Sequence, residues 1–262
     1  MATKKKVIAT VYRQDNIAEG IYDMWIETDL AQSANPGQFI SVYPQNQSTL
    51  LPRPISICEV DKKNNRIRIV YRVAGKGTSE FSGYKAGQNI SILGVLGNGF
   101  PVEKGAGKNI FLMGGGIGIP PMLELAKALS KQKDTTVNVI VGYRDDETFL
   151  AQDLEKYGNV YIATEDGSVG SKGNVMNAIA DNNLSADLIM ACGPMPMLRA
   201  IKQYAEERNI DAYISLEERM ACGVGACLGC VCKTKEVDAH SHVHNARVCT
   251  DGPVYEAREV EI

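Results

Sequence analysis

Four cysteines near the end of the sequence have a spacing that suits metal chemistry. They follow the pattern Cys-x4-Cys-x2-Cys with a distant fourth: Cys222, Cys227, Cys230 and Cys249. This is the plant-type spacing of the thiolate ligands of a [2Fe–2S] cluster. The glycines between the first two cysteines let backbone amides approach the sulfurs and donate hydrogen bonds to them. The pattern therefore predicts a one-electron redox centre.

Zinc is the alternative metal for the same thiols. It could use three of them with one histidine from a nearby alternating stretch: Cys227, Cys230 and Cys249 with His240, His242 or His244. Zinc sites do not need the four-residue step from Cys222 or the glycines inside it, so the pattern favours iron and sulfur. Cys232 lies outside the spacing, and we expect it to be a bystander.

Three short segments in the first hundred residues carry groups suited to a flavin nucleotide. A guanidinium followed by proline and serine can clamp a pyrophosphate and donate to the flavin. A tyrosine ring with a second arginine can stack and bind anions, and a Gly-Thr pair can begin a helix whose amides face a phosphate. Each segment alone is weak evidence for a flavin site, but the order of the three along the chain strengthens that interpretation. The candidate contacts are Arg53, Pro54, Ile55, Ser56, Val70, Tyr71, Arg72, Gly77 and Thr78.

Two glycine turns after apolar runs suit a second nucleotide. The first turn lies between the run 109–113 and a proline-started helix, where a nucleotide can meet the helix N-terminus. It departs from the Gly-x-Gly-x-x-Gly fingerprint, so a plain tight turn stays possible. The second ends a later strand, at the edge where doubly wound sheets bind ligands. The candidate NAD contacts are Gly114, Gly115, Gly116, Gly118, Cys192 and Gly193.

The elements that must position these groups change in character along the chain. Six short strand patterns with turn signals between them predict an antiparallel barrel: 6–12, 21–27, 38–43, 55–60, 66–73 and 89–93. Alternation over 66–73 predicts a strand with one buried face. Apolar runs then alternate with helical patterns, which predicts a doubly wound parallel sheet. From Glu217 onward neither the strand period nor the helix period is present, so we expect the segment to need a metal to fold.

These patterns define three regions and a mixed fold. We expect an all-β flavin barrel over residues 1–103, an α/β NAD-binding domain over 104–216 and a [2Fe–2S] segment over 217–262. The chain has 262 residues and a net charge of −3, and nothing in it favours nucleic acid. No stretch reads as a membrane span or a signal peptide. Clustered thiols without a leader predict a cytoplasmic protein.

In the order of its motifs, the chain resembles the ferredoxin–NADP reductase superfamily. The motifs are Arg53–Ser56, Gly114–Gly118 and Cys192–Pro194. The tail, with Ser215–Cys227 and Val248–Val254, is similar to the electron-transfer subunits of NAD-dependent dihydroorotate dehydrogenase B. One departure is visible, because the stretch from Cys230 to Cys249 is long for that family. The path of this loop therefore stays open.

The resemblance implies a division of labour between subunits. It implies FAD, one [2Fe–2S] cluster and NAD as exchangeable substrate, with the four cysteines as ligands and the nine flavin contacts above. It implies an FMN-containing dihydroorotate dehydrogenase catalytic subunit as partner, two of each in a heterotetramer, in pyrimidine biosynthesis. Electrons would pass from the partner's FMN through the cluster and FAD to NAD+.

No acid–base pair or nucleophile stands out in this chain, so no catalytic residue is assigned and cofactors must do the hard chemistry. Two other classes of protein remain open. One is a flavin and iron–sulfur subunit of a sulfide dehydrogenase or a ferredoxin:NADP+ transhydrogenase. The other is a zinc-stapled nucleotide-binding module without activity. The preference for NAD or NADP is also open, because Arg144 after a strand could face a 2′-phosphate or only solvent.

Overall fold

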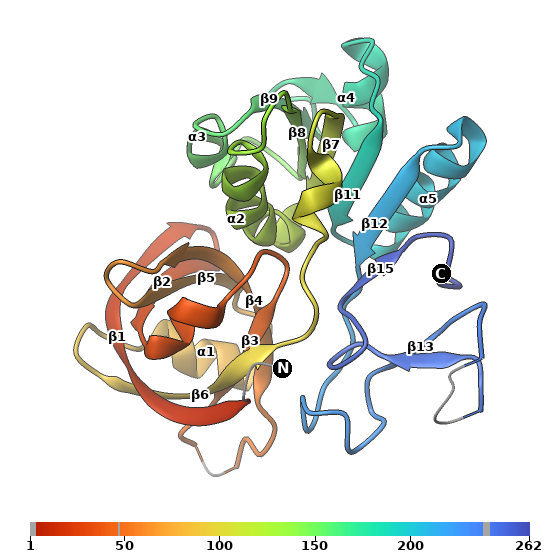
Figure 1. Ribbon diagram of the computed structural model, residues 1–262. Coiled ribbons are helices and arrows are strands. Elements are labelled where there is room, and N and C mark those ends of the chain that lie inside the picture. The colour runs from red at the N-terminus through yellow and green to blue at the C-terminus, as the bar shows by residue number, and fades with distance from the viewer. Residues whose placement is uncertain (1–3, 47, 238–241) are drawn as a thin grey trace.

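The computed structural model describes residues 4–46, 48–237 and 242–262. The first part of the chain forms a closed antiparallel barrel with the strand order β1-β2-β5-β4-β3-β6 (Figure 1). The strands are β1 (Lys5–Ala18), β2 (Ile21–Glu27), β3 (Phe39–Tyr43), β4 (Arg53–Asp61), β5 (Arg66–Arg72) and β6 (Asn89–Leu96). The predicted six-stranded barrel is confirmed. Strand β1 is longer than predicted, with two register shifts against β2, and such irregularities bend a strand around a barrel.

Two short helices complete the barrel region. They are η1 (Asp29–Ser33) after β2 and α1 (Lys76–Ser82) between β5 and β6. Apolar side chains from all six strands fill the interior, where Phe81 of α1 joins them. Burial of this apolar surface is the main force that holds α1 against the barrel, because the helix is too short to be stable alone.

The expectation of one buried face for β5 was wrong. Five consecutive residues from Ile67 to Tyr71 are buried. Arg68 points away from the barrel interior, yet it is only 8% exposed, because acidic groups surround its guanidinium. It donates to Asp23 at 2.8 Å, to Glu59 at 3.1 Å and to Asp153 at 3.2 Å. Asp153 belongs to the next domain, so the outer face of β5 is covered by that domain and not by water.

The middle of the chain forms a mainly parallel sheet with the order β10-β9-β8-β7-β11-β12-β15. Its parallel strands are β7 (Asn109–Gly115), β8 (Thr136–Tyr143), β9 (Asn159–Thr164), β10 (Ser171–Lys172), β11 (Leu188–Cys192) and β12 (Asp211–Ser215). The strand order reverses at β7, from which β8 runs to one side and β11 to the other. The predicted doubly wound parallel sheet is confirmed.

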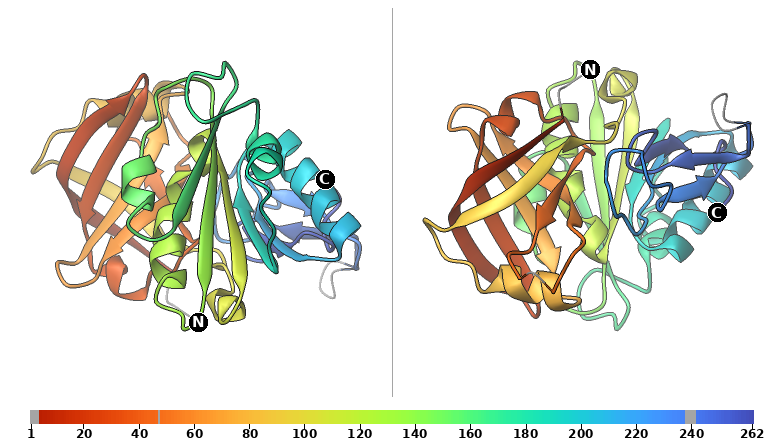
Figure 2. Two further views of the ribbon diagram at one scale, coloured as in Figure 1. Left: turned by 90° about the horizontal axis from the view of Figure 1, so that it is seen from above. Right: turned by 90° about the horizontal axis from the view of Figure 1, so that it is seen from below.

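Helices cover both faces of this sheet (Figure 2). The connecting helices are η2 (Val102–Gly105), η3 (Gly116–Gly118), α2 (Pro120–Leu129), α3 (Ala151–Leu154), α4 (Val175–Asp181) and α5 (Met195–Arg208). Helices α2 and α3 share one apolar core with residues of the barrel, whereas α4 and α5 pack on the opposite face with residues of the tail. The two cores therefore join the sheet to the barrel on one side and to the cysteine segment on the other.

The tail contains regular structure that its sequence did not indicate. Strands β13 (Val231–Lys233) and β14 (Asn245–Arg247) form a hairpin, and β15 (Val254–Glu256) pairs antiparallel with β12. A strand of three residues is too short for its alternation to be recognised in the sequence. Strand β15 forms because it pairs with the free edge of β12. Among the described residues, no helix has the length and apolarity to cross a membrane.

Candidate functional site

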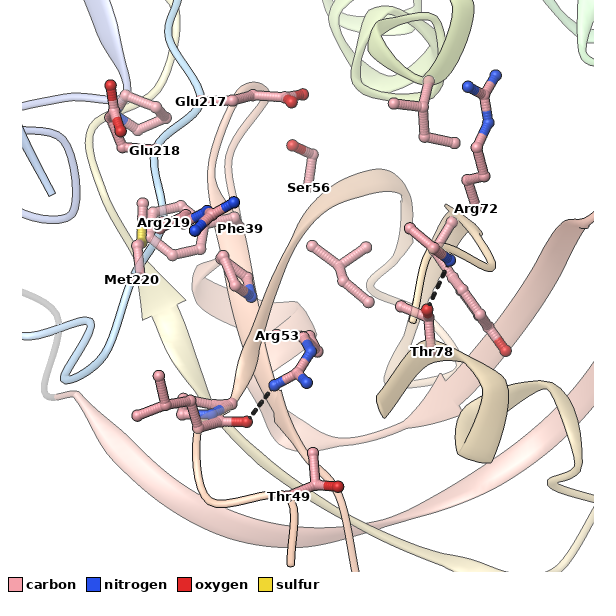
Figure 3. Close-up of a pocket in the computed structure, with 18 of the residues that line it drawn as sticks. Phe39, Thr49, Arg53, Ser56, Arg72, Thr78, Glu217, Glu218, Arg219 and Met220 are labelled. Atoms are coloured by element: carbon pink, nitrogen blue, oxygen red, sulfur yellow. Dashed lines mark hydrogen bonds between the residues drawn. The ribbon is translucent and has the colours of Figure 1, made fainter. Parts of the chain in front are cut away.

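A cavity of about 1040 Å³ lies where the barrel, the sheet domain and the tail meet (Figure 3). Strands β4 and β5 form one wall, Ile117 of η3 contributes from the sheet domain, and residues 215–220 close the third side. The structure brings eight of the nine predicted flavin contacts to this cavity, all except Gly77: Arg53, Pro54, Ile55, Ser56, Val70, Tyr71, Arg72 and Thr78. The cavity is large enough for a dinucleotide-sized ligand.

Gly77 lies directly beneath Arg53. A side chain at Gly77 would place its Cβ 2.8 Å from Nε of Arg53, which is closer than side-chain atoms pack. The glycine therefore lets the guanidinium lie against the first turn of α1. Thr78 fixes this turn, because its hydroxyl oxygen accepts from the backbone amides of Ala74 at 2.9 Å and of Gly75 at 3.2 Å. The predicted segments around Arg53 and Thr78 thus form one wall of the cavity, and this wall carries a positive charge.

The ring of Tyr71 has a different place from the stacking position expected of it. The residue is 3% exposed, and its ring stacks on Tyr22 at 5.9 Å and meets Phe81 edge-on at 6.2 Å. Its hydroxyl donates to the side chain of Gln14 at 2.7 Å. The ring is thus held in the barrel core, and we expect Tyr71 to meet a ligand through its backbone.

Four consecutive cavity residues at the start of the tail were not among the candidates from the sequence: Glu217, Glu218, Arg219 and Met220. They follow the last parallel strand and line the side of the cavity across from Arg72 and Thr78 (Figure 3). Desolvation at the cavity wall raises the pKa of the Glu217 carboxyl. The position of Glu217 just after β12 was the available signal, because ligands bind beyond the carboxyl ends of parallel strands.

The two glycine turns meet at the point where the strand order reverses. Cys192 at the end of β11 lies opposite Gly114 at the end of β7. A Cβ on Gly118 would lie 2.4 Å from the carbonyl oxygen of Cys192, and one on Gly115 would lie 2.6 Å from Sδ of Met197. The backbone contact at Gly118 requires glycine, so the two turns pack together at the carboxyl ends of β7 and β11, the position of the crevice in which doubly wound sheets bind ligands. Burial raises the pKa of the Cys192 thiol, which therefore stays neutral.

The crevice and the cavity share a boundary. Arg72 at the end of β5 reaches across to the glycine turn, where its Nη2 would lie 3.8 Å from a Cβ on Gly116. Ile117 of the same turn lines the cavity. Ser215, the last residue of β12, lines the cavity as well. A ligand in the crevice and a ligand in the cavity would therefore meet at η3, which is the arrangement that hydride transfer between two bound rings requires.

The four predicted cysteine ligands lie in two contacting pairs. Cys222 contacts Cys227, and Cys230 contacts Cys249. The amides of Val224 and Ala226 donate to Sγ of Cys222 at 3.4 and 3.3 Å. Burial raises the pKa of the Cys222 thiol, but these amides and Cys227 outweigh it and lower the pKa to about 6. The surroundings of Cys222 thus favour a thiolate, whereas burial and the neighbouring Cys230 raise the pKa of the Cys249 thiol to about 12.

This arrangement fits a cluster of two irons better than a single ion. Two thiol pairs are what a [2Fe–2S] cluster with four cysteines needs. His240 of the zinc alternative lies outside the described residues, and Nδ1 of His244 donates to the carbonyl of Lys235 at 2.9 Å. Cys232 is half-buried on β13.

Comparisons with known proteins define the class of this protein. Residues 112–203 match a family model described as an oxidoreductase NAD-binding domain, and residues 217–261 match the iron–sulfur cluster binding domain of dihydroorotate dehydrogenase B. The solved structure of an NADH-dependent reduced ferredoxin-NADP oxidoreductase covers 97% of this chain and 90% of its own, with 27% identity and a TM-score of 0.86. A ferredoxin NADP+ reductase from Neisseria gonorrhoeae with bound FAD and NADP shares the fold, at a TM-score of 0.66, 18% identity and coverage of 78% and 91%. The chain is thus a flavin- and NAD-dependent oxidoreductase of the ferredoxin–NADP reductase fold, with an iron–sulfur segment.

Curated relatives narrow the class to one family. The electron transfer subunit of dihydroorotate dehydrogenase B (NAD+) from Bacillus velezensis is 41% identical over 98% of this chain and 100% of its own length. The corresponding subunit from Fusobacterium nucleatum is 42% identical over 97% of each chain. The chain belongs to the family of dihydroorotate dehydrogenase B (NAD+) electron transfer subunits, so the resemblance inferred from its motifs is confirmed.

Proposed function

We propose that this chain carries electrons between a catalytic partner subunit that oxidises dihydroorotate and NAD+. The observation that carries the proposal is the three-sided cavity, whose walls come from the barrel, the glycine turn and the residues leading into the first cysteine. FAD, when bound there, joins two-electron hydride chemistry to one-electron transfer through an iron–sulfur cluster. The name of the family, an electron transfer subunit, supports a separate catalytic subunit.

Each candidate residue has a role that its surroundings support. Arg53 and Arg72 supply cations for the flavin pyrophosphate, and Ser56 offers a hydroxyl at the cavity wall. We assign NAD to the glycine turns 114–118 and 192–193, because they lie at the carboxyl ends of β7 and β11, where doubly wound sheets bind nucleotides. The four cysteines hold the [2Fe–2S] cluster, two on each iron. We propose the same division of the chain, into 1–103, 104–216 and 217–262, although β15 of the last segment completes the sheet of the second.

The partner is proposed to contain FMN and to assemble with this chain as a heterotetramer of two copies of each subunit. Support comes from the family name, which implies a catalytic subunit, and from the need for a two-electron acceptor at the dihydroorotate site. We propose the cytoplasm as the location, because clustered thiolates persist in a reducing compartment.

The test is the purified chain with its cofactors. We expect one FAD and two irons per chain, reduction of an artificial acceptor by NADH, and no turnover of dihydroorotate. Turnover of dihydroorotate by the pure single chain would contradict the division of labour, and zinc in place of iron would contradict the cluster. Co-purification with mass spectrometry then identifies the partner.

A subunit of a ferredoxin:NADP+ transhydrogenase is the second candidate function. It is favoured by the fold shared with the NADH-dependent reduced ferredoxin-NADP oxidoreductase over nearly the whole chain. The identity of the co-purified partner separates the two functions. A catalytic subunit that turns over dihydroorotate supports the first, and a ferredoxin-reducing partner supports the second.

A further inference from the structure

Two buried hydroxyls stand out because neither makes a hydrogen bond of normal geometry with a described residue, although the thiol of Cys232 lies close to one of them, that of Tyr255. They are Oγ of Ser41 and the phenolic oxygen of Tyr255, the two fully covered side-chain polar atoms without a hydrogen-bond partner among the described residues. Ser41 is 0% exposed and Tyr255 is 7% exposed. An unpaired buried hydroxyl costs about 1–3 kcal/mol, so folded proteins keep one only where a ligand or ordered water pairs with it.

Ser41 lies against the cysteine segment. It is on β3 between Ile40 and Val42, whose side chains fill the barrel core, so its own side chain points outward. A Cβ on Gly223 would lie 3.2 Å from the Ser41 hydroxyl oxygen. Gly223 directly follows the first ligand, Cys222, and has a φ of +68° that favours glycine. The hydroxyl is therefore held beside the Cys222–Cys227 pair.

Tyr255 lies beside the other pair. It packs in the same apolar core as Cys230 and Cys249, and the thiol of Cys232 is next to its hydroxyl. A Cβ on Gly252 would lie 2.4 Å from the Tyr255 ring, so only glycine leaves room for the ring to lie under this loop. Burial raises the pKa of Tyr255, with Cys232 adding to the effect, so the phenol keeps the proton that a donor needs.

We propose that Ser41 and Tyr255 each donate a hydrogen bond to a sulfur atom of the bound cluster, one beside each cysteine pair. This inference rests on the proposed cluster site and adds two donors from outside the cysteine motif to it. A reduced cluster carries one more negative charge than an oxidised one, and hydrogen bonds to its sulfurs favour the more negative state. Both hydroxyls therefore raise the reduction potential of the cluster.

Potentiometric titration of the full-length, FAD-loaded chain tests the two donors. The variants are Ser41→Ala and Tyr255→Phe, which remove only an oxygen, and the reduced cluster is followed by its electron-spin-resonance signal. At the wild-type midpoint potential, we expect the ratio of reduced to oxidised cluster to fall at least fivefold in each variant. For a one-electron couple this is about 40 mV, from 59 mV for each tenfold change.

Tyr143→Phe is the matched control. It also removes one buried tyrosine hydroxyl. Tyr143 is the last residue of β8, away from the tail, and its hydroxyl donates to the carbonyl of Phe149 at 2.8 Å. The ratio should stay at the wild-type value in this variant. An unchanged ratio in Ser41→Ala or in Tyr255→Phe overturns the assignment of that hydroxyl and points to a buried water as its partner.

A second measurement covers variants that lose the cluster during purification. The thermal stability of each variant is compared with wild type after a chelator has removed the metal from both. Equal or higher stability of the cluster-free variant supports the inference, because an unpaired hydroxyl has been removed. Lower stability without the cluster overturns it. A wild-type chain that shows no [2Fe–2S] signal refutes the proposed cluster itself, which is a separate result.

Discussion

Replacement of Gly118 by alanine is the sharpest test of the NAD site. The added Cβ would lie 2.4 Å from the carbonyl oxygen of Cys192 and 2.7 Å from the Cα of Gly193. Non-bonded carbon atoms are stable at about 3.5 Å, so the two turns must separate by about 1 Å. The three nearest atoms are backbone atoms at and just after the end of β11, so no flexible side chain can move aside to absorb the strain.

A displacement of about 1 Å at a site that aligns two reacting rings costs on the order of a hundredfold in rate. For Gly118→Ala we therefore expect kcat/KM for NADH to fall about a hundredfold, which is about 2.7 kcal/mol of transition-state stabilisation. The assay is NADH-dependent reduction of ferricyanide by the purified chain. FAD content, measured from the flavin absorbance, should stay stoichiometric because the flavin contacts lie on the barrel.

Gly83→Ala is the control for the added methyl group. Gly83 ends α1 with helical backbone angles (φ −84°, ψ −10°), which alanine adopts readily, and it is remote from the sheet. It should retain wild-type kcat/KM for NADH. If Gly118→Ala also keeps wild-type kcat/KM with FAD bound, the crevice between β7 and β11 does not bind the dinucleotide.

The other predictions concern the flavin, the cluster and the domain interface. Arg53→Ala should lose FAD on dilution and gel filtration because a charge-assisted phosphate contact is gone, and stoichiometric FAD after that treatment would disprove the clamp. Cys227→Ser should abolish or strongly alter the cluster signal while NADH–ferricyanide activity persists, whereas Cys232→Ser should keep a wild-type spectrum; the reverse result would show a misassigned ligand. Asp153→Asn should lower stability by about 1 kcal/mol at pH 7, because Asp153 accepts from Arg68 across the domain interface. Although burial opposes it, pairing with Lys156 and Arg68 lowers the pKa of Asp153, so its contribution is complete above about pH 4 and is lost as the pH falls further. Thermal melts of both proteins should therefore differ at pH 7 and converge in acid, and a constant difference would contradict the pairing.

The local parts of the site were accessible from the sequence. The first three cysteines lie within one short stretch of sequence, and so do the glycines of each turn. These patterns can therefore be recognised without knowledge of the fold. The barrel strands could also be found, because alternation and turn residues are local signals. The side-chain direction of Tyr71 could not, since it depends on how α1 packs into the barrel through Phe81.

What the sequence missed depends on contacts between distant segments. The alternation of β5 predicts that Arg68 faces solvent, but Asp153 of the next domain pairs with it and covers it. Strand β15 is only three residues long and exists because β12 offers it an edge. Ser41 is an ordinary strand residue until Gly223, far along the chain, lies over it. In each case the information lies in the tertiary pairing and not in the composition of either segment.

The tail ties the flavin cavity to the cluster through the backbone. Met220 lines the cavity and Cys222 is the first proposed ligand, with Ala221 alone between them. Because consecutive Cα atoms are about 3.8 Å apart, the Cα atoms of Met220 and Cys222 lie no more than about 7.6 Å apart. The other end of the segment is fixed as well, since β15 pairs with β12, the strand that leads into Glu217. The same short segment thus positions both the cavity wall and the first proposed thiolate, which keeps a flavin in the cavity and a cluster on the cysteines close together in the proposed electron path.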